Sequence, residues 1–230
     1  MGDRPKKDRA PATATACGSA FDGLPLSGEP LPLELVNTTY VKGGVRGRLV
    51  DALTGPGDLD HWLALHRDAF GTPLGAALAA AGPSGRPHLD RFLELRQALR
   101  TLVGARVSAR PAGPGEIGTV NDAARLAPHW QELGPGFVAV PRWPEPDPRL
   151  VALGEVATAG VRLLAGPDAP LLRACPAPGC VLYFVKTRTR REWCSAGCGN
   201  RVRVARHSRR IGKEDETGRR PASIPGGTAR

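Results

Sequence analysis

Long apolar runs are missing from this sequence of 230 residues. No stretch reaches the roughly 18 apolar residues that a membrane-spanning helix needs. No apolar segment follows the charged N-terminal residues, so the pattern of a secretory signal peptide is missing too. We therefore expect an intracellular protein with no membrane partner. In a reducing compartment, cysteines are more often metal ligands than disulfides.

Catalytic motifs are missing as well. The sequence has no phosphate-binding glycine loop and no recognisable nucleophile motif. His61 and His66 lack the His-Glu-x-x-His pattern of a zinc protease, and Asp51, Asp58 and Asp60 are explained by loops and helix caps. We predict that the chain is not an enzyme. A deep polar pocket with carboxylates of shifted pKa would argue for an enzyme instead.

Aromatic residues make up only 5% of the chain, whereas glycine (29) and proline (23) are abundant. The length allows one good-sized core and a small additional module. We predict an α+β fold, with a mostly helical N-terminal domain that has short strands and a small treble-clef-like module at the C-terminus. The expected divisions are a disordered tail (1–22), the α+β domain (23–166), a small cysteine-rich module with a basic helix (171–213) and a second disordered tail (214–230).

Apolar periodicity and turn residues place the main elements. Helices are expected at Asp58–Phe70 and at 89–108. A third helix should begin at Asp147-Pro148, where aspartate suits the N-cap and proline the first helical position, and should end at Gly166-Pro167. Phe137–Val140 reads as a strand. Leu31–Val36 is a short apolar run that fits a strand or a helix end equally well.

Charge is distributed unevenly along the chain. Residues 1–170 carry 18 Lys+Arg and 18 Asp+Glu, whereas residues 171–230 carry 14 Lys+Arg and 4 Asp+Glu. The net charge of +10 therefore lies entirely in the last quarter of the sequence. A uniform coding bias toward arginine cannot produce this asymmetry. A basic block of this kind is typical of a protein with a polyanionic partner.

Four of the five cysteines fall in the same region, as Cys175-x4-Cys180 and Cys194-x3-Cys198, and Cys17 stands alone. The prolines and the glycine between the first two cysteines predict a tight turn of the backbone. The second pair opens a helix, on which residues i and i+4 share one face. Val181–Lys186 should form a strand of a short hairpin. One structural Zn²⁺ with four thiolates fits this plan. The alternatives are two disulfides, incidental cysteines, an iron–sulfur cluster, which has no supporting spacing, or a redox dithiol, for which the spacing is not Cys-x-x-Cys.

Basic residues follow the cysteines closely. Between 186 and 213 there are ten of them and a single acid, Glu192. The candidate nucleic-acid contacts are Lys186, Arg188, Arg190, Arg191, Arg201, Arg203, Arg206, Arg209, Arg210 and Lys213. On the helix, several share one face, and Val204 and Ile211 should pack inward. The alternatives are an acidic protein surface as partner, or a solvated cationic face without a partner.

Cys198-Gly199-Asn200-Arg201, with the upstream Cys-Pro-Ala-Pro-Gly-Cys segment, resembles the CGNR zinc-finger family of bacterial proteins. Leu33–Thr38 and the region around Trp62 resemble the ABATE domain, the putative stress-induced transcription regulator domain that is joined to this finger. The resemblance implies that the four clustered cysteines bind zinc. We expect Gly199 to allow close packing beside the metal, Asn200 to hydrogen-bond the first cysteine turn, and Arg201 to face either that turn or the partner.

These observations favour a DNA-binding transcriptional regulator, cytoplasmic and associated with the nucleoid. Duplex DNA is the expected partner, a homodimer is expected if binding is sequence-specific, and the N-terminal domain would sense an unknown small-molecule effector or mediate dimerisation. One alternative is an RNA-binding module in which Tyr183, Phe184 and Trp193 stack on bases. The other is a module that binds a protein partner.

Overall fold

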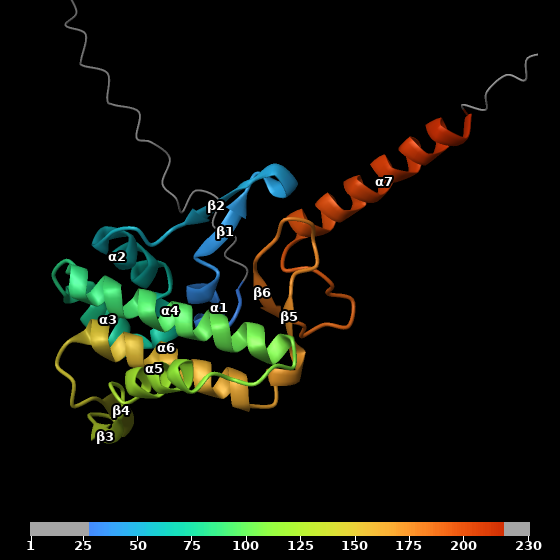
Figure 1. Cartoon of the computed structure of the whole chain (residues 1–230). Helices are drawn as coiled ribbons and strands as arrows, with labels where there is room; N and C mark the ends of the chain where they lie inside the picture. The colour runs from blue at the N-terminus through green and yellow to red at the C-terminus, as the bar shows by residue number, and fades with distance from the viewer. Residues whose placement is uncertain (1–27, 219–230) are drawn as a thin grey trace, which may run out of the picture.

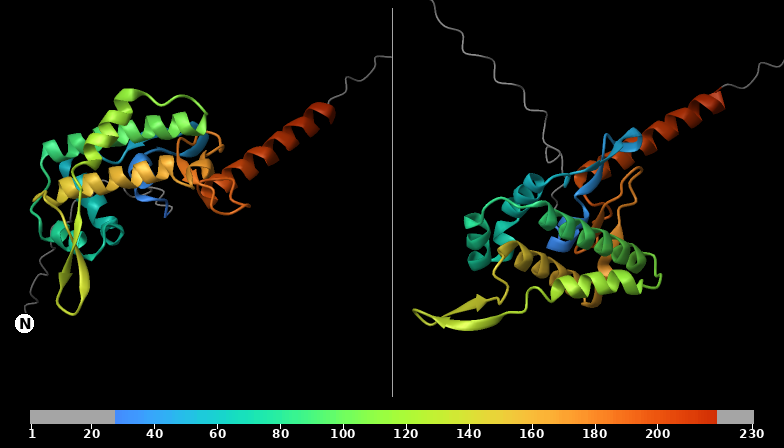
Figure 2. Two further views of the ribbon diagram at one scale, coloured as in Figure 1. Left: turned by 90° about the horizontal axis from the view of Figure 1, so that it is seen from below. Right: turned by 60° about the vertical axis from the view of Figure 1, so that its left-hand side comes forward.

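The computed structural model describes residues 28–218, with side chains described as far as His207. The expected tail at 1–22 and Cys17 lie outside these residues, as does the part of the second expected tail from 219 onward. A helical body carries a small C-terminal module from which one helix projects alone (Figures 1 and 2). Among the described residues, no helix combines the length and the apolar character that crossing a membrane requires.

The described residues form mostly helices, and the strands are short, which confirms the predicted fold class. The α-helices are α1 (Leu31–Val36), α2 (Pro56–Leu65), α3 (Thr72–Ala80), α4 (Arg86–Val107), α5 (Pro114–Ala124), α6 (Pro148–Ala165) and α7 (Ala196–Gly218). Short 3-10 helices lie at η1 (Gly44–Arg46), η2 (Arg67–Phe70) and η3 (Ala169–Leu171). The strands are β1 (Thr39–Lys42), β2 (Arg48–Asp51), β3 (Trp130–Gly134), β4 (Val138–Arg142), β5 (Leu172–Ala174) and β6 (Tyr183–Val185).

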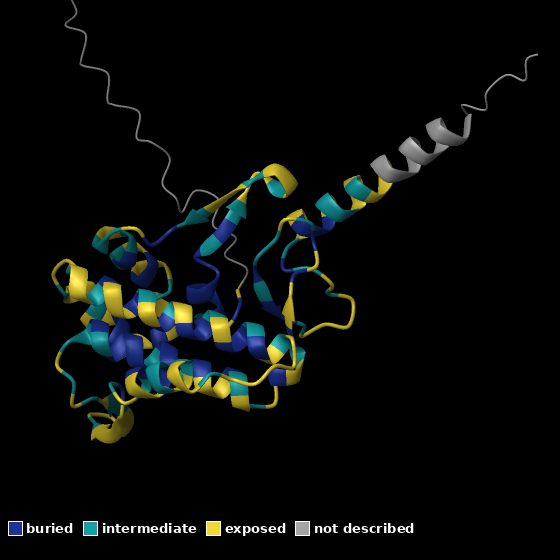
Figure 3. Ribbon diagram, viewed as in Figure 1, coloured by how far each residue is buried: buried dark blue, intermediate teal, exposed yellow. Residues whose placement is uncertain are grey.

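Helices α4, α5 and α6 form the centre of the body, and buried residues gather where they face one another (Figure 3). α6 begins as predicted, because the Asp147 carboxylate accepts a hydrogen bond of 2.9 Å from the backbone N–H of Arg149. Gly160 of α6 lies so close to α4 that an added Cβ would be 2.6 Å from Leu99 Cδ2. The small glycine therefore lets the two helices pack closely.

Each pair of strands forms a separate antiparallel hairpin: β1 with β2, β3 with β4, and β5 with β6. The strand expected at Phe137–Val140 is shifted to Val138–Arg142, because Phe137 (φ 60°) lies in the turn before it. Leu31–Val36 is a helix, and all but its first residue are buried. The helix expected at Asp58–Phe70 divides at His66, where α2 ends and η2 begins.

The C-terminal module shares its core with the body. Tyr40 and Ala52, from the β1–β2 hairpin, are buried in one cluster with Cys175, Cys194 and Cys198. A second cluster joins Leu33, Val103 and Leu163 of the body to Leu172 and Val185 of the β5–β6 hairpin. The module is thus fixed against the body at two places, on either side of β6.

Candidate metal centre and basic surface

Four cysteine sulfurs meet at the junction of the β5–β6 hairpin and α7. The Sγ atoms of Cys175, Cys180, Cys194 and Cys198 all lie within 4.8 Å of one another. Cys194 Sγ is 3.5 Å from Cys198 Sγ and 3.8 Å from Cys180 Sγ, and Cys180 Sγ is 3.7 Å from Cys198 Sγ. Three of the four residues are buried, and Cys180 is half-buried.

The first pair of cysteines lies in the turn that joins β5 to β6. The backbone N–H of Cys175 donates to Leu182 O over 2.9 Å, and that of Cys180 donates to Ala177 O over 3.0 Å. Gly179 has φ +72°, a left-handed conformation that favours glycine, and an added Cβ would meet Gly44 O at 2.9 Å. This turn therefore needs glycine both for its backbone angle and for its contact with the β1–β2 hairpin.

The second pair lies at the start of α7. Ser195 precedes the helix, and its Oγ accepts a hydrogen bond of 3.3 Å from the backbone N–H of Cys198 in the first turn. Cys194 lies just outside the helix, and Cys198 lies within it. The partial positive charge of a helix N-terminus favours the thiolate form that a metal needs.

The distances between the sulfurs fit one tetrahedral zinc ion. Zn–S bonds of about 2.3 Å place the sulfurs of a tetrahedron about 3.8 Å apart, close to the three separations given above, and no other separation exceeds 4.8 Å. A disulfide would need about 2.05 Å, and all four cysteines are free thiols. Hydrogen bonds from the thiols of Cys180 and Cys194 lower the pKa of Cys175 to about 2, and the hydrogen bond with Cys175 raises the pKa of Cys180 to about 12. Such crowded thiols share protons, and a divalent cation is what allows all four to ionise.

Arg201 lies beside this cluster rather than on the open surface. Its guanidinium donates to Pro178 O over 3.1 Å and lies 3.5 Å from Cys198 Sγ. A zinc ion with four thiolates carries a charge of about −2, which an adjacent arginine offsets. Of the two roles expected for Arg201, facing the first cysteine turn or facing a partner, this position fits the first.

Asn200, the residue before Arg201, differs from expectation. Asn200 is exposed and accepts a hydrogen bond from Arg203, one turn along α7, rather than bonding to the first cysteine turn. Gly199 is buried, and an added Cβ would be 3.2 Å from Cε3 of Trp193. The glycine therefore makes room for the tryptophan ring, which packs against the cysteine cluster.

The remaining basic residues lie on two segments next to the cluster. Arg188 and Arg190 are exposed in the loop after β6, and Lys186 is half-buried at its start. Arg203 and Arg206 are exposed on α7, whereas the side chains of Arg209, Arg210, Lys213 and Ile211 lie outside the described residues. Val204, expected to pack inward, is 65% exposed, because α7 leaves the body after its first turns (Figure 1).

Arg191 is partly buried, and its guanidinium is bound by other groups of the protein. Its guanidinium pairs with Glu29, donates to Cys194 O over 2.9 Å and lies 4.9 Å from the centre of the Phe184 ring. Glu29 is almost completely buried, and burial raises the pKa of its carboxyl group, although the backbone N–H of Val185 and Arg191 act against this. Arg191 therefore neutralises a buried acid and fixes the basic loop to the body.

Replacing Arg191 with alanine should destabilise the fold by about 2 kcal/mol, because Glu29 would stay buried without its cation. Replacing Arg188, which is exposed in the same loop, should change stability by less than about 0.5 kcal/mol. Urea unfolding of the two variants and the wild type measures this difference. Equal stability of the two variants would contradict the structural role of Arg191.

Side chains of the body also bond to the outer edge of β6, which the sequence did not predict. Asn37 Oδ1 accepts from the N–H of Tyr183 over 3.1 Å, while Asn37 Nδ2 donates to Tyr183 O over 2.9 Å. Glu29 accepts from the N–H of Val185 over 2.9 Å, and Arg100 donates to Val181 O over 2.8 Å. These bonds replace a third strand and hold the module in a fixed position.

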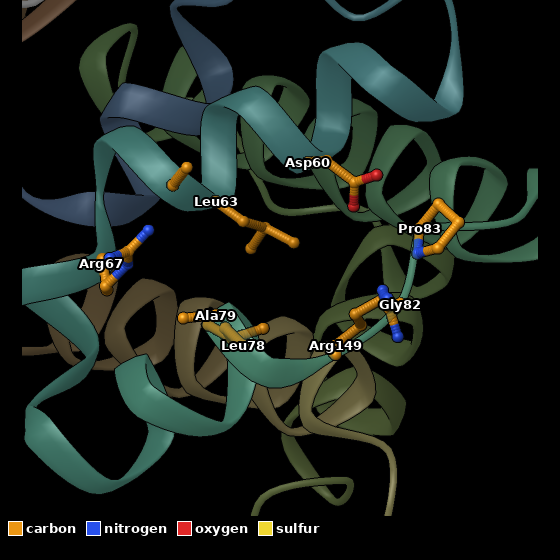
Figure 4. Close-up of a pocket in the computed structure, with 10 residues that line it drawn as sticks. Asp60, Leu63, Arg67, Leu78, Ala79, Gly82, Pro83 and Arg149 are labelled. Atoms are coloured by element: carbon orange, nitrogen blue, oxygen red, sulfur yellow. The ribbon is translucent and has the colours of Figure 1, made fainter.

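A cavity of about 250 Å³ lies apart from the cysteines, between α2, α3 and the start of α6 (Figure 4). Two polar side chains that line it, Asp60 and Arg149, both form hydrogen bonds with Ser84. The remaining lining is largely apolar, with Arg67 at the opposite side. Among the residues lining this cavity there is no Ser, Cys or His beside a base, so it lacks the arrangement of nucleophilic catalysis.

The fold and site together define a helical domain joined to a four-cysteine zinc module. Residues 29–167 match the model of the ABATE family, described as putative stress-induced transcription regulator, and residues 172–211 match the CGNR zinc finger. The chain belongs to the ABATE family and carries a CGNR zinc finger at its C-terminal side, as the resemblance predicted. Both families are of regulatory or zinc-finger type rather than enzymatic. No curated protein matches the chain.

Proposed function

We propose that this protein is a transcriptional regulator that binds duplex DNA through its zinc-held basic surface. The observation that carries the proposal is the exposure of four arginines on the two segments that flank the second cysteine pair in the sequence, Arg188 and Arg190 in the loop and Arg203 and Arg206 on α7. The metal would hold the two segments together. A projecting basic helix suits phosphate contacts and a DNA groove.

The positions of the three aromatic residues in the zinc module favour duplex DNA over single-stranded RNA. Phe184 is 1% exposed, and Trp193 packs against the cysteine cluster. Tyr183 pairs with Arg100, whose guanidinium lies 5.7 Å from the ring centre, and its hydroxyl lies against Gly104. Recognition of single-stranded RNA needs aromatic faces on which bases can stack. The three aromatic residues considered for that role are occupied by the protein itself.

Binding to random duplex DNA at several salt concentrations tests the proposal. If about six phosphates are contacted, log K should fall against log salt with a slope of about −5. A chelator that removes zinc should abolish this binding, because the two basic segments would lose their scaffold. Binding that is independent of salt would reject DNA as the partner, and competition with single-stranded RNA separates the two nucleic acids.

The homodimer and the small-molecule effector expected from the sequence remain predictions. A single finger reads few base pairs, so sequence-specific binding would need two copies of the chain on one site. Selection of sites from random duplexes tests the homodimer, because a dimer should enrich paired half-sites. Enrichment of single half-sites would contradict the dimer.

A further inference from the structure

The β1–β2 hairpin of the body carries a second basic segment. Between Thr39 and Asp51 it contains Lys42, Arg46 and Arg48 and one acidic residue, Asp51, which pairs with Arg96 of the body. Arg46 and Arg48 are exposed, and so are the apolar side chains of Val45 and Leu49, each 63% exposed. The surface of this hairpin is therefore cationic and apolar, a composition that suits DNA phosphates and sugars.

The hairpin is fixed against the zinc module. Gly179, in the first cysteine turn, lies so close to the hairpin tip that an added Cβ would be 2.9 Å from Gly44 O and 3.1 Å from Val45 Cα. A Cβ on Gly44 would in turn be 3.6 Å from Cδ of Arg201. Tyr40, at the base of the hairpin, is buried in the cysteine cluster. Hairpin and metal centre thus form one unit.

The tip of the hairpin lies beside the start of α7 in Figure 1 and in the right-hand view of Figure 2. A cleft of about 210 Å³ separates them, and it is lined by Lys42 and Gly43 of the hairpin and by Ser195 and Arg201 of the finger. The exposed arginines, Arg46 and Arg48 of the hairpin and Arg203 and Arg206 of α7, do not line the cleft, but they lie on the two elements that border it. A single polyanion could contact both.

We propose that Arg46 and Arg48 contact phosphates of the same DNA duplex that α7 binds, so that the ABATE domain supplies part of the DNA-binding surface. This inference rests on the proposed function. A two-stranded antiparallel ribbon has the width that a DNA major groove admits, and its flanking arginines reach the backbone. The finger and the hairpin would then bind the duplex together, as one surface.

The test is the salt dependence of duplex binding by the full chain with R46A/R48A. Loss of two phosphate contacts should weaken binding about 10- to 30-fold at about 0.15 M salt and make the slope of log K against log salt less steep by about 2. The variant R46K/R48K should keep most of the slope, because lysine still supplies a charge to phosphate. Lys42 stays unchanged, since it also lines the cleft beside Cys198.

The matched control is R125A/R142A, which removes two exposed arginines from the end of α5 and from β4, at the side of the body away from the hairpin (Figure 1). It should bind as the wild type does.

The outcomes separate the two proposals. If the wild type binds with a steep salt dependence and R46A/R48A binds as tightly as the control, the hairpin is not a contact, although the proposed function stands. If the wild type shows no salt-dependent binding, both fail. Equal zinc content and equal thermal midpoints show that each variant is folded.

Discussion

Replacing Cys198 with serine should cost the protein its zinc and release the module from its fixed structure. Cys198 is 3% exposed, and its sulfur lies within 3.7 Å of two other sulfurs of the cluster. A structural zinc site contributes an apparent free energy of about 10–16 kcal/mol, and a serine hydroxyl does not ionise at neutral pH to replace a thiolate. We expect zinc, measured by mass spectrometry after dialysis, to fall from about one ion per chain to almost none.

The matched control is Cys17→Ser, which changes the one cysteine that lies outside both pairs of the motif. This variant should keep its zinc and its DNA binding. Retention of stoichiometric zinc by Cys198→Ser would show that the four cysteines do not hold the ion together.

Loss of the metal should also weaken the hydrogen bonds between the body and the edge of β6. The N–H groups of Tyr183 and Val185 donate to Asn37 and Glu29, so these amides should exchange hydrogen slowly in the zinc-bound protein. In Cys198→Ser, or after chelation, their exchange should become much faster, while the amides of α4 and α6 stay protected. Slow exchange at both amides without zinc would mean that the body alone holds the hairpin.

The elements that could be predicted from the sequence are those whose cause is local. The helix α6 follows from Asp147-Pro148 at its start and from an apolar period of 3.6 residues. The hydrogen bond that the Asp147 side chain accepts from Arg149 N is the expected N-cap. The cysteine spacing likewise indicates a shared metal, because a tight turn and a helix start each fix two sulfurs within a few residues. The structure brings all four together.

What could not be predicted depends on partners far apart in the sequence. Arg191 looks like any other member of its basic run, yet its carboxylate partner, Glu29, lies 162 positions away. Asn37 bonds to Tyr183 across 146 positions. Nothing local to either residue indicates such a pairing. Arg201 was expected to face either the first cysteine turn or a partner, and only the folded turn, with Pro178 O within its reach, distinguishes the two.

The error at Val204 has a different origin. Helical spacing separates a basic face from an apolar one, but it cannot tell whether another element covers the apolar face. α7 projects from the body, so Val204 stays in contact with solvent, whereas Val202, closer to the cluster, packs against it. This geometry leaves the helix open to a partner on more than one side.

Reversing the charge at Arg203 and Arg206 should produce the largest loss of DNA binding that leaves the zinc site intact. Both side chains are exposed on α7, about one turn apart, beyond the last cysteine. R203E/R206E removes two phosphate contacts and adds repulsion, so we expect binding to weaken by about 100-fold or more at about 0.15 M salt. Titration of a labelled duplex at several salt concentrations measures both the affinity and the slope.

The control for this experiment is R125E/R142E, which makes the same change of net charge at exposed arginines of α5's end and β4. Long-range attraction depends on net charge, whereas direct contact depends on position. If both variants lose affinity equally, α7 has no specific role and the effect is one of overall charge. If only R203E/R206E loses it, with zinc still bound, the helix held by the four cysteines is the surface that meets DNA.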